Sequence, residues 1–342
     1  MDPRILETFM EDYMRKTKGT AAFVWQGGEP LLAGLNFFEH AVYLEAKYAP
    51  NNTMISNSIQ TNGTLINNQW AEFFKDYNFF VGVSVDGPAA IHDSRRVTAN
   101  GMGSFKKAMK GIQILEEYGV EYNILTVLHR GNIDKADQLM NFYEENSFQW
   151  IQFLPAMKFH SQSTEDFGEY EITSEEYANF LCYVFDRWYD EALRHDNLNY
   201  SIRFIDSVLS TYLNEDPTYC VINQKCSDTI IVEQNGDVYP CDFYMSEKWK
   251  MGNISIDSID QLLRSGSYER FRNLKSNLSE KCQNCKWKNK CYGGCPRNKK
   301  SEEHKPDVDY FCESYKKFYS YTETRMKRIA DIIKGDETTS SV

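Results

Sequence analysis

The feature that most constrains this chain is the placement of its nine cysteines. Eight of them lie between residues 220 and 312, and the ninth, Cys182, lies well before that region. The densest run is Cys282-Gln-Asn-Cys285, followed by Cys291 and Cys295. A C-x-x-C pair places two thiolates close together around one metal or cluster. At four thiolates per centre, the eight clustered cysteines predict two complete metal sites.

Two other uses of the cysteines have to be weighed. Disulfide frameworks are typical of small secreted domains that lack a core, whereas a chain of 342 residues can bury a large one. Two structural zinc sites, each with four cysteine ligands, are compatible with the spacing, so the cysteines alone leave zinc and iron–sulfur open. Cys182 has apolar neighbours on a predicted helix, and we expect it to be a core residue.

The first part of the chain alternates strand-like and helix-like segments. Strands are predicted at 21–25, 54–60, 79–85, 121–127 and 149–154, and helices at 5–16, 35–48, 67–77, 105–118 and 135–146. This alternation predicts right-handed βαβ units and an α/β fold with a parallel sheet. Because the series begins with a helix, we expect a first β-strand and its loop to precede Met1.

The alternation of predicted strands and helices ends after the last of these strands. Residues 174–213 predict two long helices, and short strands and turns follow residue 220. Within 229–239, apolar residues flank Asn235-Gly236, which is the strongest short signal for a β-hairpin. The polar tail, 334–342, is predicted to be disordered.

The loops that end the predicted strands are the candidate binding site. A parallel α/β sheet binds ligands at the carboxyl ends of its strands. The first three of these loops are Gln26-Gly27-Gly28-Glu29-Pro30, Thr61-Asn62-Gly63 and Asp86-Gly87-Pro88. Glycines there let the backbone approach a ligand closely. Neither the dinucleotide fingerprint nor the phosphate-binding P-loop occurs, which argues against both kinds of site.

Charge and hydropathy narrow the class of partner. The net charge of −11 argues against nucleic acid or anionic lipid as a partner, because both require a basic face. The sequence has no apolar run long enough to span a membrane and no leader pattern. We therefore expect a cytoplasmic protein, in which clustered thiols stay reduced and serve as metal ligands.

The strand-end motifs and the cysteines together resemble a known family. The runs WQGGEP, SIQTNG, SVDGP and PCDFY, with the spaced cysteines, resemble radical S-adenosylmethionine (SAM) enzymes that carry a SPASM auxiliary-cluster domain. Among these, the chain most resembles the anaerobic sulfatase-maturating enzymes, from about Ile5 to about Ile333. The resemblance implies a partial (β/α)6-type barrel, here lacking its first strand, followed by a small cysteine-rich SPASM domain.

The resemblance also implies domain boundaries and cofactors. We expect the truncated barrel at 1–170, linking helices at 171–213, the SPASM domain at 214–333 and the tail at 334–342. The cofactors would be SAM and [4Fe–4S] clusters, with two auxiliary clusters in this chain and a third in the full-length protein.

The resemblance assigns roles to single residues. SAM would be bound by Gly27, Gly28 and Glu29 at its amino group, and by Ser84, Asp86 and Arg96 at its ribose or carboxylate. The first auxiliary cluster would be held by Cys220, Cys226, Cys241 and Cys295, and the second by Cys282, Cys285, Cys291 and Cys312.

Three more polar residues are implicated near the substrate. Asp242, next to Cys241, matches the base that takes a proton from the substrate thiol or hydroxyl. Gln26 and Gln60 match positions that face the substrate peptide. The alternatives left open are an Asp242 without a role and glutamine amides that only satisfy backbone groups at strand ends.

One departure from the family pattern is large. Radical-SAM enzymes of this type bind the catalytic cluster with C-x-x-x-C-x-x-C after the first strand, yet no cysteine precedes Cys182 here. Either the natural start lies upstream of Met1, or this is a paralogue that has lost SAM cleavage and only binds peptide. As it stands, we predict that this chain does not form the 5′-deoxyadenosyl radical.

The function that follows is oxidation of a Cys or Ser of a sulfatase to Cα-formylglycine. The implied partners are the sulfatase polypeptide and an electron donor such as flavodoxin or ferredoxin. One alternative is a different radical-SAM/SPASM peptide maturase, for instance one that forms thioether cross-links. Another is a non-catalytic zinc or iron–sulfur protein that binds peptides.

Overall fold

Six strands form the main sheet of the protein. The computed structural model describes residues 1–157, 170–194, 199–299 and 307–335. The strands are β1 (Thr20–Trp25), β2 (Met54–Thr61), β3 (Phe79–Ser84), β4 (Tyr122–Leu128), β5 (Trp150–Pro155) and β6 (Ser201–Ile202). They are hydrogen-bonded in sequential order from β1 to β6, and the pairs β1–β2, β2–β3, β3–β4 and β5–β6 are parallel. The predicted α/β fold with a parallel sheet is confirmed, whereas β6 was not predicted.

The chain divides into two compact units. Unit 1 comprises residues 1–85, 89–125 and 228–271, and unit 2 comprises residues 86–88, 126–227 and 272–342. The helices of unit 1 are α1 (Pro3–Lys16), α2 (Leu35–Tyr48), α3 (Asn68–Asp76), α4 (Ala89–His92), α5 (Phe105–Tyr118) and α9 (Ile259–Leu262), and α10 (Gly266–Arg272) runs to its boundary. The helices of unit 2 are α6 (Ala136–Glu145), α7 (Ser174–Arg194), α8 (Arg203–Leu213), α11 (Glu280–Gln283), α12 (Lys288–Cys291) and α13 (Cys312–Ile333). The domain boundaries drawn from the sequence stay a prediction.

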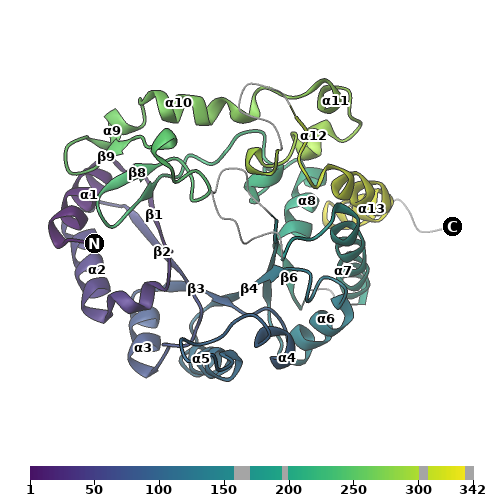
Figure 1. The fold of residues 1–342 in the computed structure, drawn as a ribbon, viewed down its shortest axis with the longest axis horizontal. Helices are drawn as coiled ribbons and strands as arrows, with labels where there is room; N and C mark the ends of the chain where they lie inside the picture. Colours follow the sequence, from purple (N-terminus) through teal and green to yellow (C-terminus); the bar gives the residue numbers. More distant parts are fainter. Residues whose placement is uncertain (158–169, 195–198, 300–306, 336–342) are drawn as a thin grey trace. The chain divides into compact units, whose positions relative to one another are not determined.

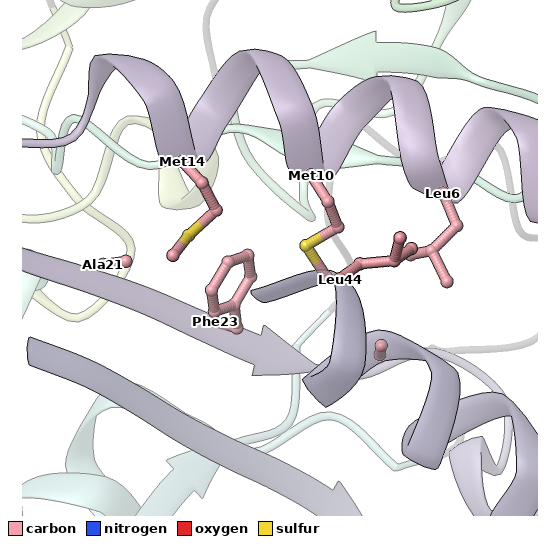
Figure 2. Close-up of a cluster of buried hydrophobic side chains, with 7 residues drawn as sticks. Leu6, Met10, Met14, Ala21, Phe23 and Leu44 are labelled. Carbon is pink, nitrogen blue, oxygen red and sulfur yellow. The ribbon is translucent and has the colours of Figure 1, made fainter. Parts of the chain in front are cut away.

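In unit 1, helices cover one face of strands β1–β3 (Figure 1). Leu6, Met10 and Met14 recur every four residues and so share one face of α1. Figure 2 shows them pointing toward Phe23 of β1 and Leu44 of α2, and all five side chains are buried. This apolar layer fixes α1 and α2 against β1 and leaves the opposite face of the strand free of helices in this unit.

A small antiparallel sheet also belongs to unit 1. Strand β7 (Ile231–Val232) pairs with β8 (Asp237–Tyr239), and β8 pairs with β9 (Gly252–Asn253). Gly236 turns the chain between β7 and β8 with a φ of +87°, and its N–H donates to the carbonyl of Glu233 at 2.9 Å. The predicted hairpin is therefore confirmed, and β9 adds a third strand that the sequence pattern did not predict.

In unit 2, the long helices α7 and α13 pack side by side (Figure 1). Near their start, the hydroxyls of Ser174 and Ser314 lie 2.7 Å apart. Further along, Arg325 forms an ion pair of 2.7 Å with Asp186. This packing fixes Cys312, the first residue of α13.

The sequence also predicts a disordered C-terminal tail and no membrane-spanning segment. Of the predicted disordered tail, residues 336–342 lie outside the described residues. Among the helices in the described part of the chain, none has the length and apolar character that crossing a membrane requires.

A buried carboxylate lies between α2 and β2. The Glu45 side chain is 2% exposed, and its Oε2 accepts a hydrogen bond of 2.9 Å from Nδ2 of Asn57, while Oε1 has no partner. Asn57 in turn accepts one of 2.9 Å from Nε1 of Trp25. Burial raises the pKa of Glu45 to about 7, although the Asn57 hydrogen bond acts to lower it.

This raised pKa predicts a pH-dependent stability. Because the folded-state pKa of Glu45 lies above its ordinary value of 4.5, the folded state binds the extra proton, and its stability falls as pH rises from about 4.5 to about 7. Glu45→Gln should therefore gain about 2 kcal/mol in the free energy of unfolding, relative to the parent chain, between pH 5.5 and pH 8.

Urea denaturation followed by circular dichroism at the two pH values measures this difference. Glu39→Gln, an exposed residue on the same helix, is the matched control and should show no such pH-dependent gain. An equal effect of Glu45→Gln at both pH values would contradict the prediction.

Candidate cofactor and cluster sites

A row of polar side chains lies on the helix-free face of β2 and β3 in unit 1. Phe79, Val81 and Val83 of β3 are buried toward the helices, so Ser84 and Gly82 face the opposite way. The register places Gln60 of β2 beside Gly82, and Nε2 of Gln60 donates to Oγ of Ser84 at 3.2 Å. A Cβ at Gly82 would lie 2.2 Å from Oε1 of Gln60, so the glycine leaves room for the amide.

The structure thus brings together one residue predicted to contact substrate, Gln60, and one predicted to contact SAM, Ser84. Both side chains are half-buried, which leaves part of each accessible to a ligand. Their roles remain predictions.

The loop after β1 is held by the carboxylate of Glu29. Its Oε1 accepts hydrogen bonds from N–H of Leu31 at 3.1 Å and from Oγ1 of Thr61 at 2.7 Å. Its Oε2 accepts one of 2.8 Å from N–H of Asn62. Glu29 therefore joins the loop after β1 to the end of β2, a role that the sequence did not predict. A contact with SAM would use the acceptor sites that these bonds leave free.

The other residues of this loop are exposed. Gly27 has a φ of +116°, a conformation open to glycine but not to residues with a side chain, and Gly28 has a φ of +51°. Gln26, Gly27 and Gly28 all lie at the surface of unit 1. An exposed backbone in this conformation can approach a ligand, as predicted for the SAM amino group.

Arg96 and Asp86 lie in different units. Arg96 is half-buried in unit 1, and its carbonyl accepts from N–H and Oγ of Ser104 at 3.2 and 2.9 Å. Asp86 is fully buried in unit 2, where its Oδ1 accepts from N–H of Val127 at 3.0 Å. Asp86 therefore braces β4 within its unit, and its contact with SAM stays a prediction.

Four predicted ligands of the second cluster share one pocket in unit 2. The lining of this pocket includes Cys282, Cys285, Cys291 and Cys312. Three of them belong to helices: Cys282 lies in α11, Cys291 ends α12 and Cys312 begins α13. N–H of Trp287 lies 3.4 Å from Sγ of Cys285 and donates to it. Such N–H···S bonds help to set the potential of an iron–sulfur cluster.

The spacing of the thiols bears on the choice between zinc and iron. Among the described residues, no three His, Cys, Asp or Glu side chains are grouped tightly enough to hold a single metal ion. A zinc ion needs its four ligands at about 2.3 Å, whereas a cubane cluster bonds each thiolate to a different iron. The four cysteines of this pocket supply the four thiolates that a [4Fe–4S] cluster needs, and a zinc site with four cysteine ligands stays open at this point.

These thiols bind metal only after losing their protons. Burial raises the pKa of Cys291 to about 12, and burial also raises the pKa of Cys312. Iron must therefore displace protons when it binds, which couples metal binding to pH.

The short loop between Cys291 and Cys295 turns the two thiols apart. Tyr292, Gly293 and Gly294 all have positive φ, at 47°, 77° and 72°. A Cβ on Gly294 would lie 2.1 Å from Oδ2 of Asp309. As a result, Cys291 lines the pocket of the second cluster, and Cys295 does not.

Asp309 is the buried side chain around which this loop is arranged. It is 3% exposed, and its Oδ2 accepts from N–H of Cys295 at 2.8 Å and from Nδ2 of Asn298 at 3.0 Å. Its Oδ1 accepts from N–H of Phe311 at 2.7 Å. Asp309 was not among the predicted site residues, because only its position three residues before Cys312 sets it apart in the sequence.

The predicted ligands of the first cluster are divided between the units. Cys220, Cys226 and Cys295 belong to unit 2, and Cys241 belongs to unit 1. Burial raises the pKa of Cys226 to about 12; the charge of Lys275 acts to lower this pKa, and the charges of Cys295 and Cys220 act to raise it. The three thiols of unit 2 are therefore electrostatic neighbours. The full ligand set stays a prediction.

The predicted base lies next to a predicted ligand. In unit 1, Sγ of Cys241 donates to Oδ1 of Asp242 at 3.2 Å. A carboxylate so placed can accept a proton close to a predicted cluster ligand. Cys182, by contrast, is 8% exposed on α7 among core residues, and its predicted role in the core is confirmed.

Two family models match the chain. The Radical SAM superfamily matches residues 4–143. SPASM, an iron–sulfur cluster-binding domain, matches residues 220–286. The resemblance that the sequence motifs indicated is therefore confirmed, together with the iron–sulfur character of the cysteine-rich region.

Curated relatives align over nearly the whole chain. The cysteine-type anaerobic sulfatase-maturating enzyme of Clostridium perfringens is 35% identical over 337 residues, covering 98% of this chain and 90% of the relative. That of Clostridium novyi is 37% identical over 331 residues, covering 96% and 88%. The serine-type enzyme of Bacteroides thetaiotaomicron is 33% identical over 338 residues, covering 94% and 80%.

Solved structures agree with these relatives. Native anSMEcpe with bound AdoMet superposes with a TM-score of 0.92 at 35% identity, covering 97% of this chain and 91% of that one. Streptococcus suis SuiB bound to S-adenosylmethionine has a TM-score of 0.62 at 18% identity, a likeness that shows the fold alone. Identity above 30% over nearly the full length is the decisive finding. The chain belongs to the anaerobic sulfatase-maturating enzymes, a radical-SAM family with a SPASM domain.

Proposed function

We propose that this protein oxidises a cysteine or serine side chain of a sulfatase to Cα-formylglycine. The observation that carries the proposal is the near full-length similarity to both cysteine-type and serine-type maturating enzymes. The similarity to anSMEcpe solved with bound AdoMet and Kp18Cys peptide adds a peptide-binding relative, with a TM-score of 0.92. When bound, SAM and the iron–sulfur clusters supply the one-electron steps, which are hydrogen-atom removal from the target Cβ and acceptance of the second electron.

The chain's own residues position the reactants and move the proton. Glu29 fixes the loop whose exposed glycines would meet the SAM amino group, and Ser84 would contact its ribose or carboxylate. Gln60, held across Gly82, would orient the substrate peptide. Asp242 would accept the proton of the target thiol or hydroxyl as the side chain is oxidised.

The partners and setting follow from this chemistry. The substrate is a sulfatase polypeptide, and an electron donor such as flavodoxin or ferredoxin supplies reducing equivalents. The protein acts in the cytoplasm, where its thiols stay reduced. All nine cysteines, each within the described residues, are free of disulfides.

The cluster assignment predicts the metal content of the chain. After anaerobic reconstitution, we expect about eight irons per chain and a broad absorption band near ~400 nm from two [4Fe–4S] clusters. Cys285→Ala should lose about four irons, because a four-iron cluster needs its four thiolates. Metal analysis and absorption spectroscopy measure both.

The matched control is Cys182→Ala, which removes a buried thiol of the core and should leave the iron content unchanged. About two zincs per chain and no colour would contradict the assignment and would support structural zinc sites with four cysteine ligands each.

The base assignment predicts a selective loss of turnover. Because no cysteine precedes Cys182, the assay uses this chain joined to an upstream segment that carries C-x-x-x-C-x-x-C. Asp242→Asn should slow formylglycine formation on a sulfatase peptide by about 10²–10⁴-fold, the usual contribution of a general base. Binding of the peptide should change little.

Mass spectrometry of cysteine and serine forms of the peptide measures the product and identifies the target type. Glu247→Gln, an exposed carboxylate on the same unit, is the control and should react at the parent rate. The chain without the added segment should yield no product. An Asp242→Asn enzyme that works at the parent rate would refute the assignment of the base.

The close approach of Gln60 to Gly82 predicts that a side chain at position 82 weakens binding of the substrate peptide. Gly82→Ala would bring a Cβ to 2.2 Å from Oε1 of Gln60, so the amide must move and its hydrogen bond to Ser84 is lost. We expect about tenfold weaker binding of a labelled sulfatase peptide, measured by fluorescence anisotropy on the reconstituted chain. Stability should change little, since the atoms that the Cβ meets are at the ends of the Gln60 and Asn123 side chains.

Gly266→Ala is the matched control, because a Cβ there meets no atom within 4 Å. Unchanged peptide affinity in Gly82→Ala would exclude Gln60 from the peptide site.

A further inference from the structure

A lysine is buried against the backbone of Cys220, a predicted ligand of the first auxiliary cluster. Lys275 ends a short 3₁₀ turn of unit 2, Asn273–Lys275, and only 3% of it is exposed. Its ammonium donates hydrogen bonds of 3.0 Å to the carbonyl oxygens of Cys220 and of Val221. Lys275 therefore holds the turn that carries a predicted cluster ligand.

No carboxylate in the described part of the chain balances the charge of the Lys275 ammonium. Among the described residues, no Asp or Glu forms an ion pair with Lys275. An ammonium has three donors, and the two carbonyls account for two of them. Burying a charge without an opposite charge costs several kcal/mol, so fully buried lysines are found with partners.

The negative groups around Lys275 are cysteine sulfurs. Burial lowers the pKa of its ammonium, and the thiolate charges of Cys226, Cys295 and Cys220 act to raise it, ahead of a smaller contribution from Cys291, a predicted ligand of the second cluster. The first three are predicted ligands of the first cluster, and they belong to the same unit as Lys275. An iron–sulfur cluster with four thiolates is an anion, and bound there it would supply the charge that the carboxylates do not.

We propose that Lys275 is the buried counter-cation of the first auxiliary cluster and holds its reduction potential up. A fixed positive charge stabilises the reduced cluster, which is the more negative form, relative to the oxidised one. Net charge and burial are among the properties that set the potentials of such clusters. The same side chain positions Cys220 through its carbonyl, as the residues around a metal ligand commonly do.

This role suits a cluster that accepts an electron during substrate oxidation. The more positive its potential, the more favourable the transfer of one electron to it. Lys275 forms and breaks no covalent bond in this step. The inference rests on the predicted ligands of the first cluster and is independent of the substrate.

Three substitutions separate charge from hydrogen bonding. Lys275→Arg keeps the charge, Lys275→Gln keeps donors without charge, and Lys275→Met keeps neither. The reconstituted chain is titrated anaerobically against redox mediators and followed by electron paramagnetic resonance. Cys285→Ala, which removes a predicted ligand of the second cluster, identifies which signal belongs to which cluster.

We expect the glutamine and methionine variants to reduce the equilibrium constant for reduction of the first cluster about tenfold. For a one-electron couple this is a shift of about 59 mV to more negative potential. The arginine variant should keep the parent potential, and so should Lys334→Met, an exposed lysine after α13. The potential of the second cluster should shift less than that of the first in every variant, because only Cys291 of its predicted ligands acts on Lys275.

Loss of the first cluster's four irons from the glutamine and methionine variants, but not from the arginine variant, would also support the counter-cation. A glutamine variant with the parent potential would overturn it, because hydrogen bonding alone would then suffice. An arginine variant that shifts or loses iron as much as the others would overturn it too. The titration uses no peptide and no SAM, so a wrong substrate assignment does not alter its outcome.

Discussion

The hydrogen bonds that Asp309 accepts from the backbone fix two segments of unit 2 that carry predicted ligands of different clusters. Oδ2 binds N–H of Cys295, and Oδ1 binds N–H of Phe311, the residue before Cys312. One carboxylate thus fixes a predicted ligand of the first cluster and the start of the helix that carries a ligand of the second. The left-handed turn of residues 292–294 is possible there because Gly294 has no Cβ to meet the same carboxylate. Thiols close in sequence can then serve different clusters.

The periodic parts of the fold and the hairpin at Asn235-Gly236 could be predicted from the sequence, and the short strands β6 and β9 could not. Strands β1 to β5 and the helices that separate them have the spacing of apolar residues that a buried face requires. β6 and β9 each contain two residues, too few for a period to be visible. Their pairing is decided by neighbours distant in the sequence, as for Trp150 of β5 with Ser201 of β6.

The candidate site also has parts that could be predicted from the sequence and parts that could not. Cysteine spacing and strand-end loops identify ligands and loops, because those signals are local in the sequence. Glu29 was expected at the SAM site, but its bonds to Thr61 and Asn62 depend on the pairing of β1 with β2. Lys275 lies about fifty residues from the carbonyls it binds, and nothing in its neighbourhood in the sequence marks it as different from a surface lysine. Such roles exist only in the folded chain.

Glu45 and Lys275 show two ways in which this protein accommodates a buried charge. Glu45 accepts one hydrogen bond, from Asn57, and has no ion-pair partner among the described residues. Burial therefore raises its pKa to about 7, and the carboxylate can become neutral at little cost. Lys275 is as deeply buried, yet the groups around it are thiols that become negative when iron binds. A proton can neutralise the buried charge of Glu45, whereas an anionic cluster would balance the buried charge of Lys275. A buried cation beside cysteines is therefore an electrostatic argument for a metal cluster that does not depend on the spacing of the cysteines in the sequence.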